Sequence, residues 1–173
     1  MAEEIVAHAR IPGAFNEAQL VQNIALGAVL IWRFLAIHSQ ASKTGCRFPL
    51  CFMVLPILFH HATRDAAIST YPSSPLSKFV EKFEGRREEL LALHDRMLAM
   101  KALSQRSIQL ALERRLIAVL PEDALVIAFH TAKYPKSLVP ESLRPMIRAS
   151  EKLGGWLGPH DLAHISNQLR VFF

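Results

Sequence analysis

Histidine is the residue type in this chain whose number and spacing come nearest to a chemical site. The chain has eight histidines, and two pairs of them stand out. His60 and His61 are adjacent, so on a helix their rings point in different directions and do not easily share a metal ion. His160 and His164 are spaced to share one helix face, but Asp161 is in the wrong register for a third ligand. The pattern therefore favours ordinary surface or interface histidines over a metal centre.

Catalytic motifs are missing from the full sequence. It contains no zinc-protease helix, no nucleophile elbow and no Walker phosphate loop. The acidic residues of 81–89 alternate with basic ones, as on a solvated helix face rather than in an enclosed acid–base site. Cys46 and Cys51 lack the spacing of zinc ligands, so we expect no metal and no cofactor. We predict that the chain is not an enzyme; a small hydrolase has only the histidines in its favour.

Four large side chains are candidates for contacts with a partner protein, because tryptophan and arginine are enriched among the residues that anchor interfaces. These predicted partner contacts are Trp32, Arg33, Arg64 and Trp156. Arg33 and Arg64 each place a charge at the end of an apolar segment. The alternative for Trp32 is a place in the core, and the alternative for Arg33 is an internal pair with an acidic residue.

Three arginines lie where a winged helix places its DNA-recognition element, on or at the end of the helix before a predicted hairpin. These possible DNA contacts are Arg106, Arg114 and Arg115. Contacts of arginine with phosphate are sensitive to salt and independent of base sequence. The alternative is solvent-exposed charge on an amphipathic helix.

Two apolar segments dominate the elements that must position these residues. Apolar residues recur at three- and four-residue spacing over residues 17–38, which predicts a core helix capped by Asn16. Gly27 in this helix indicates the close approach of another backbone, because glycine otherwise weakens a helix. A second helix begins near Pro49 and is kinked at Pro56.

Short helices are predicted for the middle of the chain. Thr63 is expected to cap one of them, and a long amphipathic segment follows over residues 76–101 with a break at Gly85. Ser104 is expected to cap a helix that ends near residue 115. Each of these helices has an apolar side and a charged side.

A change of period then predicts a β-hairpin, with strands at 116–120 and 125–129. A helix over 142–157 follows, and the tail at 169–173 is expected to add an edge strand or to contact a partner. The predicted fold is therefore mainly α: a single helical domain with a small β-hairpin, winged-helix-like.

One domain is expected to span residues 1–173. Residues 1–15 are predicted to form an irregular N-terminal segment, and residues 104–130 to form the winged-helix-like portion. Residues 154–155 are two adjacent glycines, which indicate a helix end or a site of close packing.

The composition favours a subunit over an isolated protein. Hydrophobic residues make up 51% of the 173 residues, and the mean hydropathy of +0.20 is high for a soluble monomer. A large permanent interface explains such an excess, as does a helix-rich core. The net charge of +5 is spread along the chain, so proximity to DNA is allowed but not required.

A membrane span is not expected from the sequence. The longest charge-free apolar run before Arg33 has about ten residues, whereas a span needs ~20. The N-terminus opens with acidic residues and lacks the apolar core of a signal peptide. We therefore expect a soluble, cytoplasmic protein.

The order of several short blocks resembles the middle component of three-component ABC systems, over about residues 15–170. The blocks are Asn23, Ala25, Gly27 and Ala28 with Trp32-Arg33-Phe34; Pro49-Leu50, Val54-Leu55-Pro56, Leu58, His60, Thr63-Arg64 and Ser69-Thr70; Leu76 to Phe83; Leu90 to Arg96; the helix of 104–116; and Glu151-Lys152-Leu153-Gly154 with Trp156. The aromatic tail at 171–173 departs from this pattern.

Such middle components are similar to the accessory subunit of Lamassu-type defence complexes. The resemblance implies a bacterial anti-phage or anti-plasmid system of three proteins. One is an SMC/Rad50-like ABC ATPase with a long coiled coil, one is a variable effector that is often a nuclease, and the middle component bridges them without catalysis. The resemblance supplies no catalytic residues.

Two functions from different classes follow from these observations. The first is a non-catalytic adaptor that docks on the SMC-like ATPase and holds the effector nuclease, with DNA met through the complex. The second is a stand-alone winged-helix DNA-binding regulator, which the predicted hairpin after an arginine-bearing helix favours.

Overall fold

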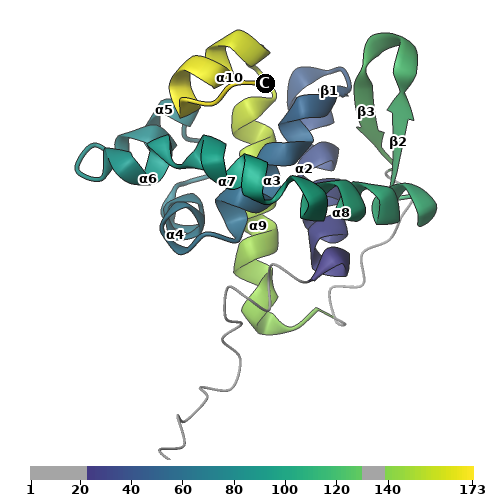
Figure 1. The fold of residues 1–173 in the computed structure, drawn as a ribbon, viewed down its shortest axis with the longest axis horizontal. Helices are drawn as coiled ribbons and strands as arrows, with labels where there is room; N and C mark the ends of the chain where they lie inside the picture. Colours follow the sequence, from purple (N-terminus) through teal and green to yellow (C-terminus); the bar gives the residue numbers. More distant parts are fainter. Residues whose placement is uncertain (1–22, 130–138) are drawn as a thin grey trace, which may run out of the picture.

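The computed structural model describes residues 23–129 and 139–173 (Figure 1). The expectations for residues 1–15, for Asn16 as a cap and for residue 130 lie outside the described residues.

The central element is helix α2, Ile24–Ser42. Its N-cap is Asn23, whose side-chain oxygen accepts a hydrogen bond from the backbone N–H of Leu26 at 2.8 Å. The helix ends at Lys43, which has left-handed backbone angles. The predicted core helix is confirmed, but its expected passage through residue 23 is wrong because Asn23 has non-helical angles and caps it.

Helix α9, Arg144–Leu157, packs along α2, and the two helices approach most closely at Gly154. A Cβ atom on Gly154 would lie less than 3.0 Å from the carbonyl oxygen of Phe34 and from the backbone nitrogen of His38. The hydroxyl of Ser150 donates a hydrogen bond to the carbonyl of Leu30. The close packing predicted at 154–155 is therefore confirmed at the first of the two glycines.

Gly27 makes the corresponding close approach on the other side of α2. A Cβ atom there would lie within 3.0 Å of the Ser107 side chain, which belongs to helix α8, Lys101–Glu113. The predicted close approach is present, although the neighbour is this small side chain rather than a backbone.

Three helical elements follow α2 and the short strand β1 (Cys46–Arg47). The 3₁₀ turn Phe48–Leu50 leads into α3, Cys51–Leu58, which contains Pro56, and α4 is His61–Ser69. Thr63 lies inside α4, and its buried hydroxyl donates to the carbonyl of Ile57 at 2.6 Å. The prediction that Thr63 caps this helix is therefore wrong.

The long amphipathic segment is divided into three short helices, which are α5 (Leu76–Glu81), α6 (Arg87–Leu91) and α7 (Leu93–Ala99). The predicted break at Gly85 falls between α5 and α6. Ser104 lies inside α8 and is buried, so it does not cap that helix.

The strands form a three-stranded antiparallel sheet. The hairpin consists of β2 (Ile117–Leu120) and β3 (Leu125–Ala128) around the turn Pro121–Asp123, and β1 (Cys46–Arg47) pairs with the other edge of β3. The order is β1-β3-β2. A helix lies before β1 and another lies directly before the hairpin, as in a winged helix, but the six helices α3 to α8 separate β1 from β2. The predicted mainly α domain with a small hairpin is thus confirmed, with β1 as an addition, and the winged-helix-like character of residues 104–130 stays a prediction.

The last helix is α10, Leu162–Leu169. Asp161 caps it by accepting a hydrogen bond from the N–H of His164 at 2.7 Å. Residues 170–173 are not a strand. Val171 is buried in this chain's own core.

Helix α2 corrects the expectation about spanning length. The charge-free run stops at Arg33, but the helix continues to Ser42, and its 18-residue window has a mean hydropathy of 1.4. By length and composition α2 could therefore cross a membrane. In this fold it is a core helix, with 56% of that window buried beneath α8, α9 and β3.

Candidate functional site

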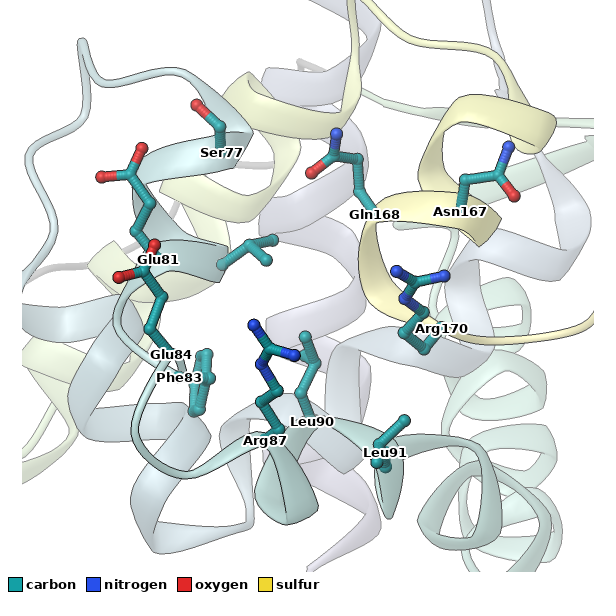
Figure 2. A pocket seen from close by; sticks show the side chains of 11 residues that line it. Ser77, Glu81, Phe83, Glu84, Arg87, Leu90, Leu91, Asn167, Gln168 and Arg170 are labelled. Carbon is teal, nitrogen blue, oxygen red and sulfur yellow. The ribbon is translucent and has the colours of Figure 1, made fainter.

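A groove of about 810 Å³ lies between α5, α6 and α10 (Figure 2). Helices α5 and α6 are consecutive in the sequence and α10 is far from both, and the three meet on the side of the molecule opposite the hairpin (Figure 1). The apolar part of the groove comes from Val80, Phe83, Leu90 and Leu91. Phe83 and Leu90 are buried, so they form a fixed floor beneath the opening.

The side of the groove formed by α5 carries negative charge, and the sides formed by α6 and by the end of α10 carry positive charge. Glu81 and Glu84 follow the α5 side, whereas Arg87 on α6 and Arg170 after α10 extend from the other sides (Figure 2). Glu81 is paired with Lys78, whose pKa is raised mainly by this hydrogen bond of 2.6 Å. Within the described residues, no ion pair engages the other three charges.

A left-handed turn at the end of α10 positions Arg170 over the groove. Its φ angle is 56°, which stops the helix, and the N–H of Val171 then donates back to the carbonyl of Ser166 at 3.2 Å. The same turn directs Val171 into the core. Burial of one residue therefore holds the neighbouring guanidinium at the opening.

Three exposed apolar side chains lie on α6, α7 and the tail, and we call them the apolar strip: Leu91, which lines the groove, Leu98 and Phe172. Their exposed fractions are 59%, 60% and 76%. The ring of Phe172 packs edge-on against His94, with centroids 5.5 Å apart. Large exposed apolar groups beside a groove are typical of a protein-interaction surface.

The second candidate surface is the face of α8 and the hairpin. Arg106, Arg114 and Arg115 are all exposed there, as the predicted DNA contacts should be. The turn of the hairpin carries Glu122 and Asp123, which are also exposed. Acidic groups at the tip weaken attraction to phosphate, so this face has a mixed charge rather than a basic one.

The predicted partner contacts lie mostly inside the chain. Trp32 is 4% exposed and its indole N–H donates to the carbonyl of Phe129 at 3.3 Å, and Trp156 is 3% exposed and donates to the carbonyl of Pro72 at 3.2 Å. Both rings are therefore core residues of the single chain. Whether any of the four residues meets a partner stays a prediction.

The two arginines of that set are partly buried. The Nε of Arg33 donates to a carboxylate oxygen of Glu151 at 2.8 Å, which realises the internal pair considered for it. Arg64 lies 3.6 Å from the carboxylate of Asp65. The groove brings together none of the seven predicted site residues.

The block of residues on α9 that resembles the family, Glu151-Lys152-Leu153-Gly154 with Trp156, makes its polar contacts within this chain. Glu151 pairs with Arg33, and the ammonium of Lys152 donates to the carbonyls of Ile68 and Thr70 at the end of α4. Burial lowers the pKa of Lys152, with smaller contributions from nearby cations. This block therefore ties α9 to α2 and α4.

The histidines are dispersed. His60 and His61 pair with different carboxylates, those of Glu89 and Asp65. His160 and His164 stack with their centroids 4.2 Å apart, and burial, followed by repulsion from His164, lowers the pKa of His160. Among residues 23–129 and 139–173, no group of three potential ligands could hold a metal ion.

The groove was not predicted from the sequence, because it depends on how α10 returns to α5 and α6. The sequence shows only that the segments around the groove carry charged residues, a pattern that any solvated helix face also has. No local pattern marks such a meeting of distant segments.

Comparison with known proteins identifies one family. The sequence matches the family described as "ABC-three component (ABC-3C) system Middle Component 3" over residues 14–173. No curated protein and no solved structure matches the chain. Because the match covers nearly the whole sequence, the chain belongs to this family of middle components of ABC-three component systems.

Proposed function

We propose that this middle component is a non-catalytic adaptor that joins an SMC/Rad50-like ABC ATPase to an effector nuclease. The complex is a bacterial defence system of the Lamassu type, acting in the cytoplasm against phage or plasmid DNA. The chain contributes binding surfaces and positions its two partners. The chemistry belongs to those partners.

One observation carries this proposal: two exposed surfaces lie at opposite ends of a continuous core. The groove of α5, α6 and α10 and the face of α8 with the hairpin are widely separated (Figure 1). Helix α2 packs against α8 on one side and α9 on the other, and Trp156 of α9 in turn stacks on Phe79 of α5. A protein that holds two partners at once needs two such separate surfaces.

The groove has the properties of a binding surface rather than of an active site. It combines the exposed side chain of Leu91 with three charges, Glu84, Arg87 and Arg170, that form no ion pair with any described residue. Burial of exposed apolar surface against a partner contributes roughly 25 cal/mol per Å² to the stability of the complex, before the costs of association. Unpaired charges at the rim set the orientation and the rate of association.

Reconstitution of the three components tests the proposal. The two other components of the system are co-expressed with and without this chain, with one of them tagged, and the purified material is analysed by size exclusion with light scattering. We expect the ATPase and the effector to elute together only when this chain is present. A stable ATPase–effector complex without it, or a chain that remains monomeric beside both, would contradict the adaptor role.

The order of α8 and the hairpin favours direct DNA contact as a second candidate function. Along the chain α8 directly precedes the hairpin, as a recognition helix would. Fluorescence anisotropy of the isolated chain with duplex DNA at ~50 and ~200 mM salt tests it, because phosphate contacts weaken steeply with salt. Binding that is lost in Arg106→Glu supports this function. Absence of binding at low salt removes it.

A further inference from the structure

We propose that the groove between α5, α6 and α10 receives an amphipathic helix from another component of the system. The apolar stripe of that helix faces Val80 and Leu91. One of its flanks is basic and lies against Glu84, and the other is acidic and lies against Arg87 and Arg170. This inference rests on the proposed adaptor function and names the kind of segment that this surface binds.

The geometry favours a helix over an extended peptide. All three elements that form the groove are helices or helix ends, and the described strands lie on the other side of the molecule (Figure 1). An extended peptide is bound by pairing with the edge of a sheet, which this groove lacks. A helix laid between helices instead presents side chains at three- and four-residue spacing to an apolar floor.

The charges around the opening define the flanks of the partner helix. Glu84 stands on one side of the opening and Arg87 and Arg170 stand on the others, all exposed (Figure 2). Because no described residue forms an ion pair with these three, they are available to opposite charges on a partner. Opposite signs on opposite flanks suit a helix whose apolar stripe separates basic from acidic residues.

The same charges disfavour other occupants. The carboxylates of Glu81 and Glu84 repel a nucleic-acid backbone. A small-molecule site buries most of its ligand and has convergent buried polar groups, whereas every charged group here is exposed. A second copy paired by two-fold symmetry through this groove would place one hollow against another, which leaves both unfilled.

The apolar strip extends the contact beyond the groove. Leu91 lines the groove and is 59% exposed, and Phe172 packs on His94, which follows Leu91 at the start of α7. A helix that leaves the groove along α6 and α7 covers these side chains as well. The apolar surface that these side chains expose in the single chain would then be covered by the partner helix in the complex.

Photo-crosslinking within the co-expressed three-component complex identifies the segment. Benzoyl-phenylalanine replaces Leu91, and in a matched control it replaces Leu112, an exposed leucine on α8. We expect crosslinks from position 91 to residues spaced three or four apart in one segment of one component. Crosslinks to that segment from position 112 as well, or from position 91 to a non-helical segment or a second copy, would overturn the inference.

Charge reversal tests the flanks. The double variant Arg87→Glu, Arg170→Glu is expected to weaken association about tenfold or more, and Glu84→Lys about threefold, because each places like charges together. Arg148→Glu, an exposed arginine outside the groove, serves as the control and is expected to have no effect. An acidic-to-lysine change in the crosslinked segment should restore binding to the double variant only.

The outcomes separate this inference from the adaptor role. If the complex forms and the groove variants bind as the wild type does, the helix inference fails while the adaptor function stands. If light scattering shows a dimer of this chain that the groove variants abolish, the occupant is a second copy and the inference fails. If no complex forms with any variant or with the wild type, both fail.

Discussion

The interface between α2 and α9 and the groove between α5, α6 and α10 use the same residue types in opposite ways. In the first, Arg33 and Glu151 pair with each other across two helices. In the second, Arg87 and Arg170 have no ion pair with any described residue. The charges of the first region thus hold the chain together, and those of the second are available to a partner.

Two aromatic residues, one on α9 and one in the tail after α10, differ in the same way. Trp156 is buried, stacks with Phe79 at 5.7 Å and has its N–H satisfied within the chain. Phe172 rests on one histidine and leaves most of its ring exposed. Substitutions in the first region should therefore affect stability, and those in the second should affect association.

The largest effect on stability is expected from Gly154→Ala. The new methyl group would lie less than 3.0 Å from backbone atoms of α2, which can move only by separating the helices. We expect a loss of about 3 kcal/mol in the free energy of unfolding, measured by urea denaturation. Gly155→Ala is the matched control, because its Cβ would meet only Ile37 at 3.7 Å. An equal loss in both variants would contradict the close packing.

His38 should give the core a dependence on pH. Burial lowers its pKa from 6.5 to about 4, and neither ring nitrogen has a hydrogen-bond partner among the described residues. Between pH 6.5 and pH 4 the unfolded chain binds a proton at this ring and the folded chain does not. Stability is therefore fully present above pH 6.5 and falls as the pH is lowered through this window, by at most about 3 kcal/mol.

Urea denaturation at pH 7, 6, 5 and 4, on the wild type and on His38→Gln, measures this dependence. The difference between the two proteins should decrease as the pH falls. Parallel curves would show that another group controls acid stability.

The Arg33–Glu151 pair should contribute a smaller amount. Both side chains are about a quarter to a third exposed, at 24% and 30%, so solvent weakens their attraction. A double-mutant cycle with Arg33→Ala and Glu151→Ala is expected to give a coupling energy of about 1 kcal/mol. A coupling energy near zero would mean that this pair does not help to hold α9 on α2.

The smallest effect on stability is expected in the groove. The double variant Arg87→Glu, Arg170→Glu removes no ion pair with a described residue. Its free energy of unfolding should therefore differ from that of the wild type by no more than about 0.5 kcal/mol, with a correspondingly small shift of the unfolding midpoint. Thermal denaturation of the isolated chain measures it. A large destabilisation would show that these arginines support the fold and are not reserved for a partner.

The sequence predicts the apolar helices and the hairpin well, because periodicity is a local property. It predicts caps poorly: Thr63 and Ser104 are buried inside helices, whereas Asn23 is the cap. A hydroxyl before a helical pattern does not reveal whether its group faces the backbone or the core. Strand β1 is also missed, since two residues carry no alternation and depend on pairing with Val126 and Leu125.

The candidate site is the least predictable part. Residue type alone leaves both an interface and the core open for Trp32, and in the single chain packing between helices buries Trp32 and Trp156. The groove needs α10 to return beside α5 and needs Arg170 in a left-handed turn. Both features depend on tertiary structure.

Co-purification of the groove variant with its two partners tests the adaptor account most directly. This chain is tagged, co-expressed with the two other components as the wild type and as Arg87→Glu, Arg170→Glu, and the bound components are quantified. We predict that the variant loses one component and keeps the other, with its unfolding midpoint unchanged. Retention of both components, or loss of both from a folded chain, would contradict a bridge made of two separate surfaces.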